Sequence, residues 1–121
     1  ENPNAIDELC AHEIVDLNPL PGQEPGLQGL RQAVGEYVRA FPDMRVTVHQ
    51  VVAEGDVVVV RMTGEGTHSG SLLGAPATGK KVTFRAIDMI RVKNGMATEV
   101  WHEGNDVEVL GQIGVKVPVT T

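Results

Sequence analysis

The stretch Lys81-Val-Thr-Phe-Arg-Ala-Ile-Asp-Met-Ile-Arg-Val92 decides the fold, because apolar and polar residues alternate along it as they do in a half-buried β-strand. One face of this strand would carry Val82, Phe84, Ala86, Asp88, Ile90 and Val92. Asp88 is the only charged residue in that series. Burying a carboxylate is costly unless it is paired, hydrogen-bonded or protonated. Asp88 is therefore either a structural partner, for instance of Arg61, or a general acid or base in a dry cavity.

The bulk composition fits one globular domain over residues 1–121. A chain of 121 residues can bury a real core, and 41% hydrophobic with 21% charged residues is ordinary for a folded protein. The formal net charge is -6 and no basic run occurs, so we expect neither nucleic acid nor a membrane as partner. No apolar run approaches the ~20 residues of a membrane span, and the start does not resemble a secretory signal. We expect a cytoplasmic protein.

Cysteine and histidine usage argues against a metal or disulfide framework. Cys10 is the only cysteine, which excludes an intrachain disulfide. The four histidines, at positions 12, 49, 68 and 102, lack the close spacing of zinc ligands. We expect no metal and no cofactor, and we expect His12 and His49 to be surface residues.

The first third of the chain predicts helices around a short extended segment. Asn2 and Pro3 are a typical cap and first turn for a short helix reaching Cys10, and 12–18 is expected to be extended. A Pro-rich loop then leads into a helix over 27–41, which Pro42 ends. Its apolar stripe consists of Leu27, Leu30, Val34, Val38 and Phe41.

The remainder predicts an antiparallel sheet and a last helix. Strands are expected over 44–53, 57–67, 80–92 and 96–103, and a helix capped by Asn105 over 106–113. The Val57–Val60 run predicts a strand covered on both faces. Asn94-Gly95 is typical of a two-residue hairpin turn. Helices followed by a curved sheet give an α+β fold, in which the N-terminal helices pack on the concave face of a conical barrel with a cavity at its open end.

The segment from Phe41 to Gly114 resembles the SnoaL-like polyketide cyclases of the nuclear transport factor 2-like superfamily. The resemblance is carried by Phe41-Pro-Asp43, Val52-Ala-Glu-Gly-Asp56, Gly66-Thr-His68 with Gly70, Gly74-Ala-Pro-Ala-Thr-Gly79, Ile87-Asp88, Asn94-Gly95, Glu99-Val-Trp101 and Leu110-Gly-Gln-Ile-Gly114. Weaker support comes from Asp16-Leu-Asn-Pro19. The resemblance implies a conical α+β barrel around an apolar cavity, often dimeric through its sheet.

The resemblance also implies a chemistry. The family's best-understood members close rings of aromatic polyketides by an intramolecular aldol reaction that needs neither metal nor cofactor, with an aspartate four residues beyond the motif tryptophan as acid and base. Here Asn105 is four residues beyond Trp101, and Asp106 follows. An amide can hydrogen-bond an enolate but cannot take its proton at neutral pH. Some cyclases carry a histidine where this chain has Asp88.

These considerations give a set of candidate catalytic residues. Asp88 would be the base, and His102 or Asn105 would polarise the carbonyl, with Asn18 as a further polar group near the pocket. The resemblance places Trp101 in the cavity wall, and alternation would then turn His102 away unless a bulge intervenes. Asp106 is either an acid or base or a first-turn helix acid.

Large side chains supply the candidate substrate contacts. Trp101, Phe84, Met62 and Tyr37 could each contact a flat hydrophobic ligand or simply be core, and His68 is a pocket-mouth residue or a solvated strand end. We expect a cofactor-independent cyclase, lyase or isomerase that acts by acid–base chemistry on a small hydrophobic carbonyl compound, as a homodimer. The alternative is a non-catalytic domain for ligand binding or assembly that has lost the cyclase aspartate, and Asn105 is the residue that favours it.

Overall fold

The computed structural model describes residues 5–20 and 22–115. Its elements follow one another as α1 (Ala5–Leu9), β1 (Cys10–Asp16), α2 (Gly26–Ala40), β2 (Arg45–Glu54), β3 (Val57–Thr67), β4 (Lys81–Lys93), β5 (Met96–Gly104) and α3 (Asp106–Gln112). The expected cap of the first helix, Asn2 with Pro3, lies outside the described residues. The other predicted elements are all present, and β3 has the predicted bounds.

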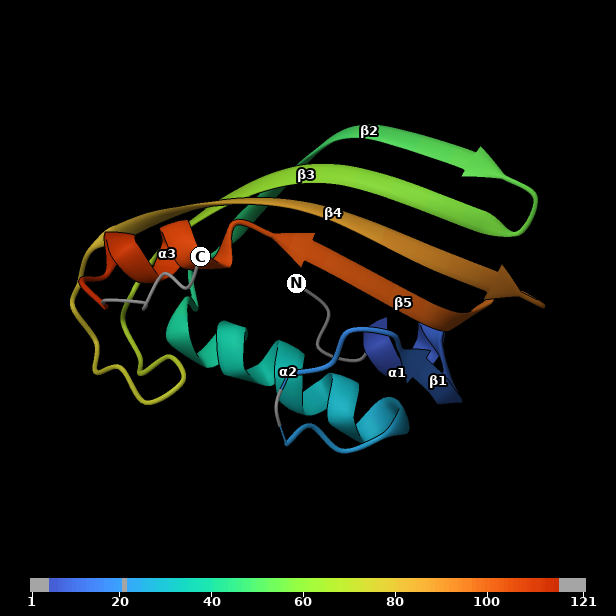
Figure 1. Ribbon diagram of the computed structural model, residues 1–121, viewed down its shortest axis with the longest axis horizontal. Coiled ribbons are helices and arrows are strands. Elements are labelled where there is room, and N and C mark those ends of the chain that lie inside the picture. The colour runs from blue at the N-terminus through green and yellow to red at the C-terminus, as the bar shows by residue number, and fades with distance from the viewer. Residues whose placement is uncertain (1–4, 21, 116–121) are drawn as a thin grey trace, which may run out of the picture.

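The strands form one five-stranded mixed sheet in the order β1-β5-β4-β3-β2. β1 pairs parallel with β5, and the other neighbours are antiparallel. The sheet arches over the three helices, which lie on one side of it (Figure 1). α2 packs mainly against β1, and α3 packs against β4. The predicted α+β cone, with its helices on the concave face, is confirmed.

Turn chemistry sets the register of the hairpins. Asn94 and Gly95 both have positive φ, of 53° and 77°, as an Asn-Gly hairpin turn requires, and they join β4 to β5. Gly55, with φ of 59°, turns β2 into β3. The long antiparallel pairing of β3 with β4 then runs without a register shift from Val57–Arg91 to Thr67–Lys81. This regularity makes it possible to assign which side chains share a face.

The compact part of the core lies at one end of the sheet, where α2 ends and α3 begins. Its buried members are Ala40, Phe41, Leu72, Val82, Val109 and Ile113. The Phe41 N–H donates to the Tyr37 carbonyl and closes the last turn of α2, which leaves the Phe41 ring against Phe84, edge to face with centroids 4.8 Å apart. The apolar stripe of α2 is thus buried at its ends, whereas Val34 and Val38 are 40% and 54% exposed.

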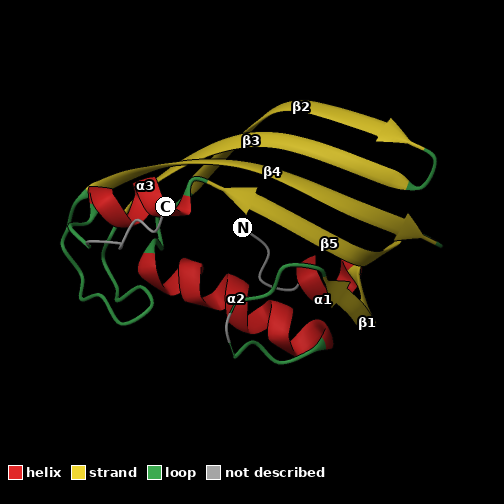
Figure 2. Cartoon of the chain, in the orientation of Figure 1, coloured by secondary structure: helices red, strands yellow, loops and turns green. Residues whose placement is uncertain are grey.

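The other end of the sheet is open (Figure 2). β2 is an edge strand and is exposed at every residue, and its pairing with β3 shifts register at His49. The valines of β3, expected to be covered on both faces, are only half-buried. That expectation was wrong because the helices pack against strands at the other side of the sheet, so an apolar run in β3 meets neighbouring strands more than a covering layer.

Candidate active site

Asp88 and His102 face one another across β4 and β5. They are direct cross-strand partners, and Nδ1 of His102 lies 2.5 Å from Oδ1 of Asp88. Asp88 belongs to the same face as Val82 and Phe84, which pack against the helices, so the pair lies on the concave side of the sheet. Alternation along β4 therefore brings Asp88 to His102 on the concave face. The sequence predicted His102 on this face only if a bulge intervened in β5.

Two expectations about this face are wrong. On β3 the cross-strand partner of Asp88 is Val60, so Arg61 points to the opposite face and cannot be its ion-pair partner. Trp101 pairs with Met89 and also points to the opposite, convex face, where its indole N–H donates to Glu103. With Trp101 outside, the strict period of two puts His102 inside without any bulge between Trp101 and His102.

The hydrogen bond to Asp88 stabilises the charged form of the His102 imidazole relative to its neutral form. A carboxylate can only accept hydrogen bonds, so Nδ1 of His102 is protonated and donates the hydrogen bond to Asp88. The pKa of His102 is raised above its ordinary value, first because of this hydrogen bond and then because of the charges of Asp88, Asp106 and Asp16, while burial opposes the increase. In the neutral Nδ1–H tautomer, Nε2 is the nitrogen that can accept a proton from a ligand.

Gly104 makes room beside that nitrogen. A methyl group on Gly104 would lie 3.2 Å from Nε2 of His102 and 3.3 Å from Oδ1 of Asp106. Both atoms therefore border the same small space above the glycine. Sequence reasoning missed Gly104, although a glycine between His102 and Asp106, where a strand passes into a helix, was the available signal.

Asn18 contacts the backbone of His102 and not the open face. Its amide nitrogen donates to the His102 carbonyl, and its amide oxygen accepts the His102 N–H at 3.0 Å. Its own N–H donates to Asp16 at 3.1 Å. The expected substrate contact is thus replaced by a contact to the neighbouring strand.

Asn105 precedes α3 but does not cap it through its side chain. Its N–H donates to the Arg85 carbonyl at 3.1 Å, and its amide oxygen accepts the Arg85 N–H at 2.8 Å, which extends the β4–β5 pairing by one step. Asn105 thus occupies the predicted cap position, but its side chain makes no cap hydrogen bond because β4 takes the oxygen that would accept it. The amide nitrogen is buried without a partner among the described residues, so its hydrogen-bond donors are unpaired.

The remaining candidates divide between site and core. Met62 is half-buried on the concave face. Phe84 and Tyr37 pack at the edge of the core, and burial, followed by the charges of Asp106 and Glu36, raises the pKa of Tyr37. His68 is fully buried against Phe41.

His68 was wrongly expected at a pocket mouth or in solvent. Its Nδ1 lies 2.9 Å from the Thr78 hydroxyl and accepts the Thr78 N–H at 3.3 Å, so the ring anchors the loop between β3 and β4. His12 and His49 are exposed, as predicted.

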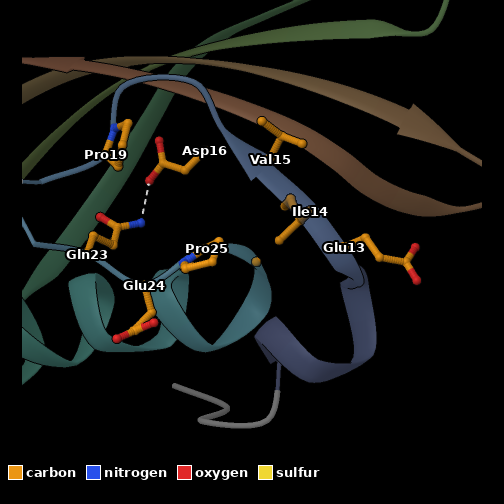
Figure 3. A pocket seen from close by; sticks show the side chains of 9 residues that line it. Glu13, Ile14, Val15, Asp16, Pro19, Gln23, Glu24 and Pro25 are labelled. Carbon is orange, nitrogen blue, oxygen red and sulfur yellow. Dashed lines mark hydrogen bonds between the residues drawn. The ribbon is translucent and has the colours of Figure 1, made fainter.

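The pair is not enclosed in the expected dry cavity. The side chain of His102 is 52% exposed and that of Asp88 24%. A hollow of about 490 Å³ lies between β1 and the start of α2, beside Asp16 and Gln23 (Figure 3). A second, of about 400 Å³, lies over Arg61, Arg85 and Asn105. Neither hollow is lined by Asp88 or His102. These two residues, called the dyad below, are therefore exposed directly on the concave face.

That concave face is mainly aliphatic near the dyad. Val60 and Met62 of β3 share it, and beyond them Val46, Val48 and Val51 of β2 are about half exposed. No group of three or more His, Cys, Asp or Glu side chains within residues 5–20 and 22–115 is placed to hold a metal ion. No helix in the described part of the chain is long and apolar enough to cross a membrane.

A five-stranded mixed sheet that curves over helices defines an α+β cone of the nuclear transport factor 2-like class. The family model described as SnoaL-like polyketide cyclase matches residues 1–113. The chain belongs to this family. No curated protein matches it significantly in sequence.

Solved structures agree with this assignment. TsrD from Streptomyces laurentii is 30% identical with a TM-score of 0.84, over 95% of this chain and 84% of that one. IdmH from Streptomyces antibioticus, a candidate polyketide cyclase, is 32% identical with a TM-score of 0.76, over 93% and 86%. A candidate polyketide cyclase from Bacillus cereus is 26% identical with a TM-score of 0.82, over 96% and 72%.

Proposed function

We propose that this protein is a cofactor-independent acid–base enzyme of the cyclase or isomerase type, acting on a small hydrophobic carbonyl compound. The observation that carries the proposal is the Asp88–His102 pair on the concave face, with Nδ1 of His102 2.5 Å from the carboxylate. A carboxylate that fixes the tautomer of a histidine leaves its other nitrogen ready for proton transfer. Membership of the SnoaL-like family and the aliphatic surroundings support the same interpretation.

The geometry suggests roles different from those inferred from the sequence. Asp88 already accepts from His102, so we assign the base to Nε2 of His102 and the orienting role to Asp88. Nε2 takes a proton from the carbon next to a carbonyl, and the electron pair of that C–H bond forms the enolate. The enolate carbon then attacks a second carbonyl of the same molecule, or is reprotonated elsewhere, and the imidazolium returns the proton to the resulting alkoxide or carbon. The charge of Asp88 stabilises the imidazolium between these steps.

The enolate oxygen needs a hydrogen-bond donor during this sequence. The amide nitrogen of Asn105 is buried and has no partner among the described residues, and Asn105 follows directly on Gly104 at the dyad. A preorganised donor at a developing oxyanion can contribute ~3 kcal/mol to lowering a barrier. We assign this role to Asn105, with Asp106 as a second carboxylate beside Nε2.

Proton exchange next to a carbonyl tests the first step without knowledge of the product. Bicyclic and tricyclic aryl ketones whose spontaneous exchange is slow would be incubated with the protein in D₂O and followed by NMR. We expect accelerated exchange with the wild type, loss of the acceleration in His102→Gln and a large decrease in Asp88→Asn. His49→Gln is the matched control, because His49 is exposed on β2 and away from the dyad.

Unchanged exchange in His102→Gln would contradict the proposed mechanism. The alternative function is a non-catalytic domain that binds a hydrophobic ligand, and the half-exposed state of the dyad together with Asn105 in the cyclase position favours it. Binding of a ketone by the wild type without any acceleration of exchange would support this alternative.

We also propose that the protein is a homodimer through the convex face of its sheet. Ile87, Met89 and Trp101 lie on that face and are 48%, 49% and 39% exposed. Neighbouring exposed apolar side chains on a sheet are typical of an interaction surface.

A further inference from the structure

The pairing of β1 with β5 ends in a side chain. Asp16 is opposite Val100, and the Leu17 N–H donates to the Val100 carbonyl at 2.8 Å. One residue further, the Asn18 side chain takes over: its amide accepts the N–H of His102 at 3.0 Å and donates to the carbonyl of the same residue. A side-chain amide has the same donor and acceptor groups as a peptide unit. The Asn18 side chain therefore continues the β1–β5 hydrogen bonding where the backbone leaves the sheet before Pro19.

This contact fixes the face on which the dyad forms. The Asn105 N–H bonds the Arg85 carbonyl, and hydrogen-bonded and non-hydrogen-bonded pairs alternate along an antiparallel ladder. Counting from that pair puts Asp88 and His102 in a non-hydrogen-bonded pair, whose side chains approach each other most closely. The N–H and carbonyl of His102 consequently point towards β1, and Asn18 is the residue that receives both.

Asn18 is itself held in place by a short chain of polar contacts. The Asn18 N–H donates to one carboxylate oxygen of Asp16 at 3.1 Å, and the Gln23 amide donates to the other at 2.9 Å (Figure 3). The Gln23 amide oxygen accepts the Leu20 N–H at 3.0 Å, and the Gln23 N–H donates to the Leu20 carbonyl at 3.0 Å. The loop that carries Asn18 is therefore tied both to the edge of the sheet and to the approach to α2.

We propose that Asn18 is the positioning residue of His102, holding its peptide unit so that the imidazole reaches Asp88 on one side and the space above Gly104 on the other. The inference rests on the proposed function, in which His102 is the base. Without Asn18 the last part of β5 would have one unpaired edge next to the half-exposed histidine, and the ring would lose its fixed distance from the carboxylate. Asn18 acts through the backbone and does not touch the reacting atoms.

The titration of His102 tests this without any substrate. Imidazole ¹⁵N signals would be followed against pH by NMR in the wild type and in Asn18→Ala, with His102 assigned through His102→Gln. Gln112→Ala is the matched control, because the Gln112 amide makes the same double contact, accepting the Thr83 N–H at 2.9 Å and donating to its carbonyl at 3.0 Å. That contact lies at Thr83, near the start of β4.

We expect both variants to melt several degrees below the wild type, and only Asn18→Ala to change His102. Its titration midpoint should fall towards the ordinary histidine value, and its neutral form should change from the Nδ1–H tautomer to a mixture. Where a turnover assay exists, kcat should fall about 10-fold or more with KM little changed, and the lower limb of the kcat pH profile should move with the NMR midpoint.

An unchanged midpoint and tautomer in Asn18→Ala would overturn the proposal, and so would an equal change in Gln112→Ala, since both would mean that Asn18 only supports the fold. If Asn18→Ala does not fold, Asn18→Asp replaces it: a carboxylate oxygen would then face the His102 carbonyl, and retention of the Nδ1–H tautomer would overturn the proposal. Failure of the proposed function would be seen in a different experiment: His102→Gln would then exchange the protons next to a carbonyl as fast as the wild type.

Discussion

Gly104→Ala would add one methyl group to the centre of the candidate site. The methyl would lie 3.2 Å from Nε2 of His102, 3.3 Å from Oδ1 of Asp106 and 3.3 Å from the carbonyl oxygen of Arg85. Ordinary contacts of a methyl carbon are longer, so each neighbour must move by a few tenths of an ångström. The carbonyl belongs to the backbone of β4 and moves least, so the His102 ring and the Asp106 carboxylate are displaced instead.

The expected cost to folding is small and the cost to function large. Overpacking costs about 1–3 kcal/mol. The lower end applies because the side chains of His102 and Asp106 are exposed and can move, and replacing glycine returns about 0.4–1 kcal/mol through the unfolded state. We expect a net destabilisation of about 1 kcal/mol or less. Proton transfer at Nε2 should nevertheless fall about 10- to 100-fold, because small misplacements of a catalytic group are costly.

Thermal denaturation and ketone exchange in D₂O would measure the two effects separately. Gly111→Ala is the matched control: Gly111 lies in α3, a methyl group added there would meet no neighbouring atom within 4 Å, and the variant should gain stability as helical glycines do when replaced. Exchange at the wild-type rate in a folded Gly104→Ala protein would refute the placement of the reaction beside Gly104.

Three further predictions concern stability and assembly. Because the pKa of His102 is raised in the folded state, its pairing with Asp88 stabilises the fold fully below about pH 6.5. This stabilisation is lost as the pH rises through the folded-state pKa. In urea titrations the unfolding free energy of the wild type should therefore exceed that of His102→Gln by more at about pH 6 than at about pH 9. Gly29→Ala should cost about 3 kcal/mol or more, because its methyl would lie 1.5 Å from the carbonyl oxygen of Glu24. Gly35→Ala in the same helix meets only a side chain at 3.4 Å and should instead gain stability in the same titration. Met89→Lys should convert a dimer into a monomer in sedimentation experiments, and a wild type that already sediments as a monomer would exclude the proposed convex interface.

The sequence predicted the elements well because their signals are local. The period of two in β4, the Asn-Gly turn and the apolar stripe of α2 depend only on neighbouring residues, and they set the observed bounds to within a residue or two. The odd position of Asp88 was likewise predictable from alternation alone. What alternation within one strand could not provide was the partner across the sheet.

The errors about the site have a common cause, which is register. The faces of β5 depend on how it pairs with β4, and the pair Asp88–His102 settles them against the expectation that Trp101 lined the cavity. The expected pairing of Arg61 with Asp88 was wrong for the same reason, because the β3–β4 register places Val60 and not Arg61 opposite Asp88. Asn18 and Asn105 were interpreted as free polar groups, although the amide oxygen of each accepts a neighbouring backbone N–H. Such contacts join residues far apart in sequence and leave no local trace.

The register shift at His49 has a consequence for the behaviour of the chain at high concentration. β2 ends the sheet and exposes Val46, Val48, Val51 and Val52, a pattern that could recruit the edge of another molecule and start aggregation. The extra residue at His49 interrupts this edge near its middle, so an incoming strand could match only one half at a time. The bulge at His49 therefore makes β2 a poorer template for pairing with another molecule. Removal of the bulge would favour fibril-like self-association.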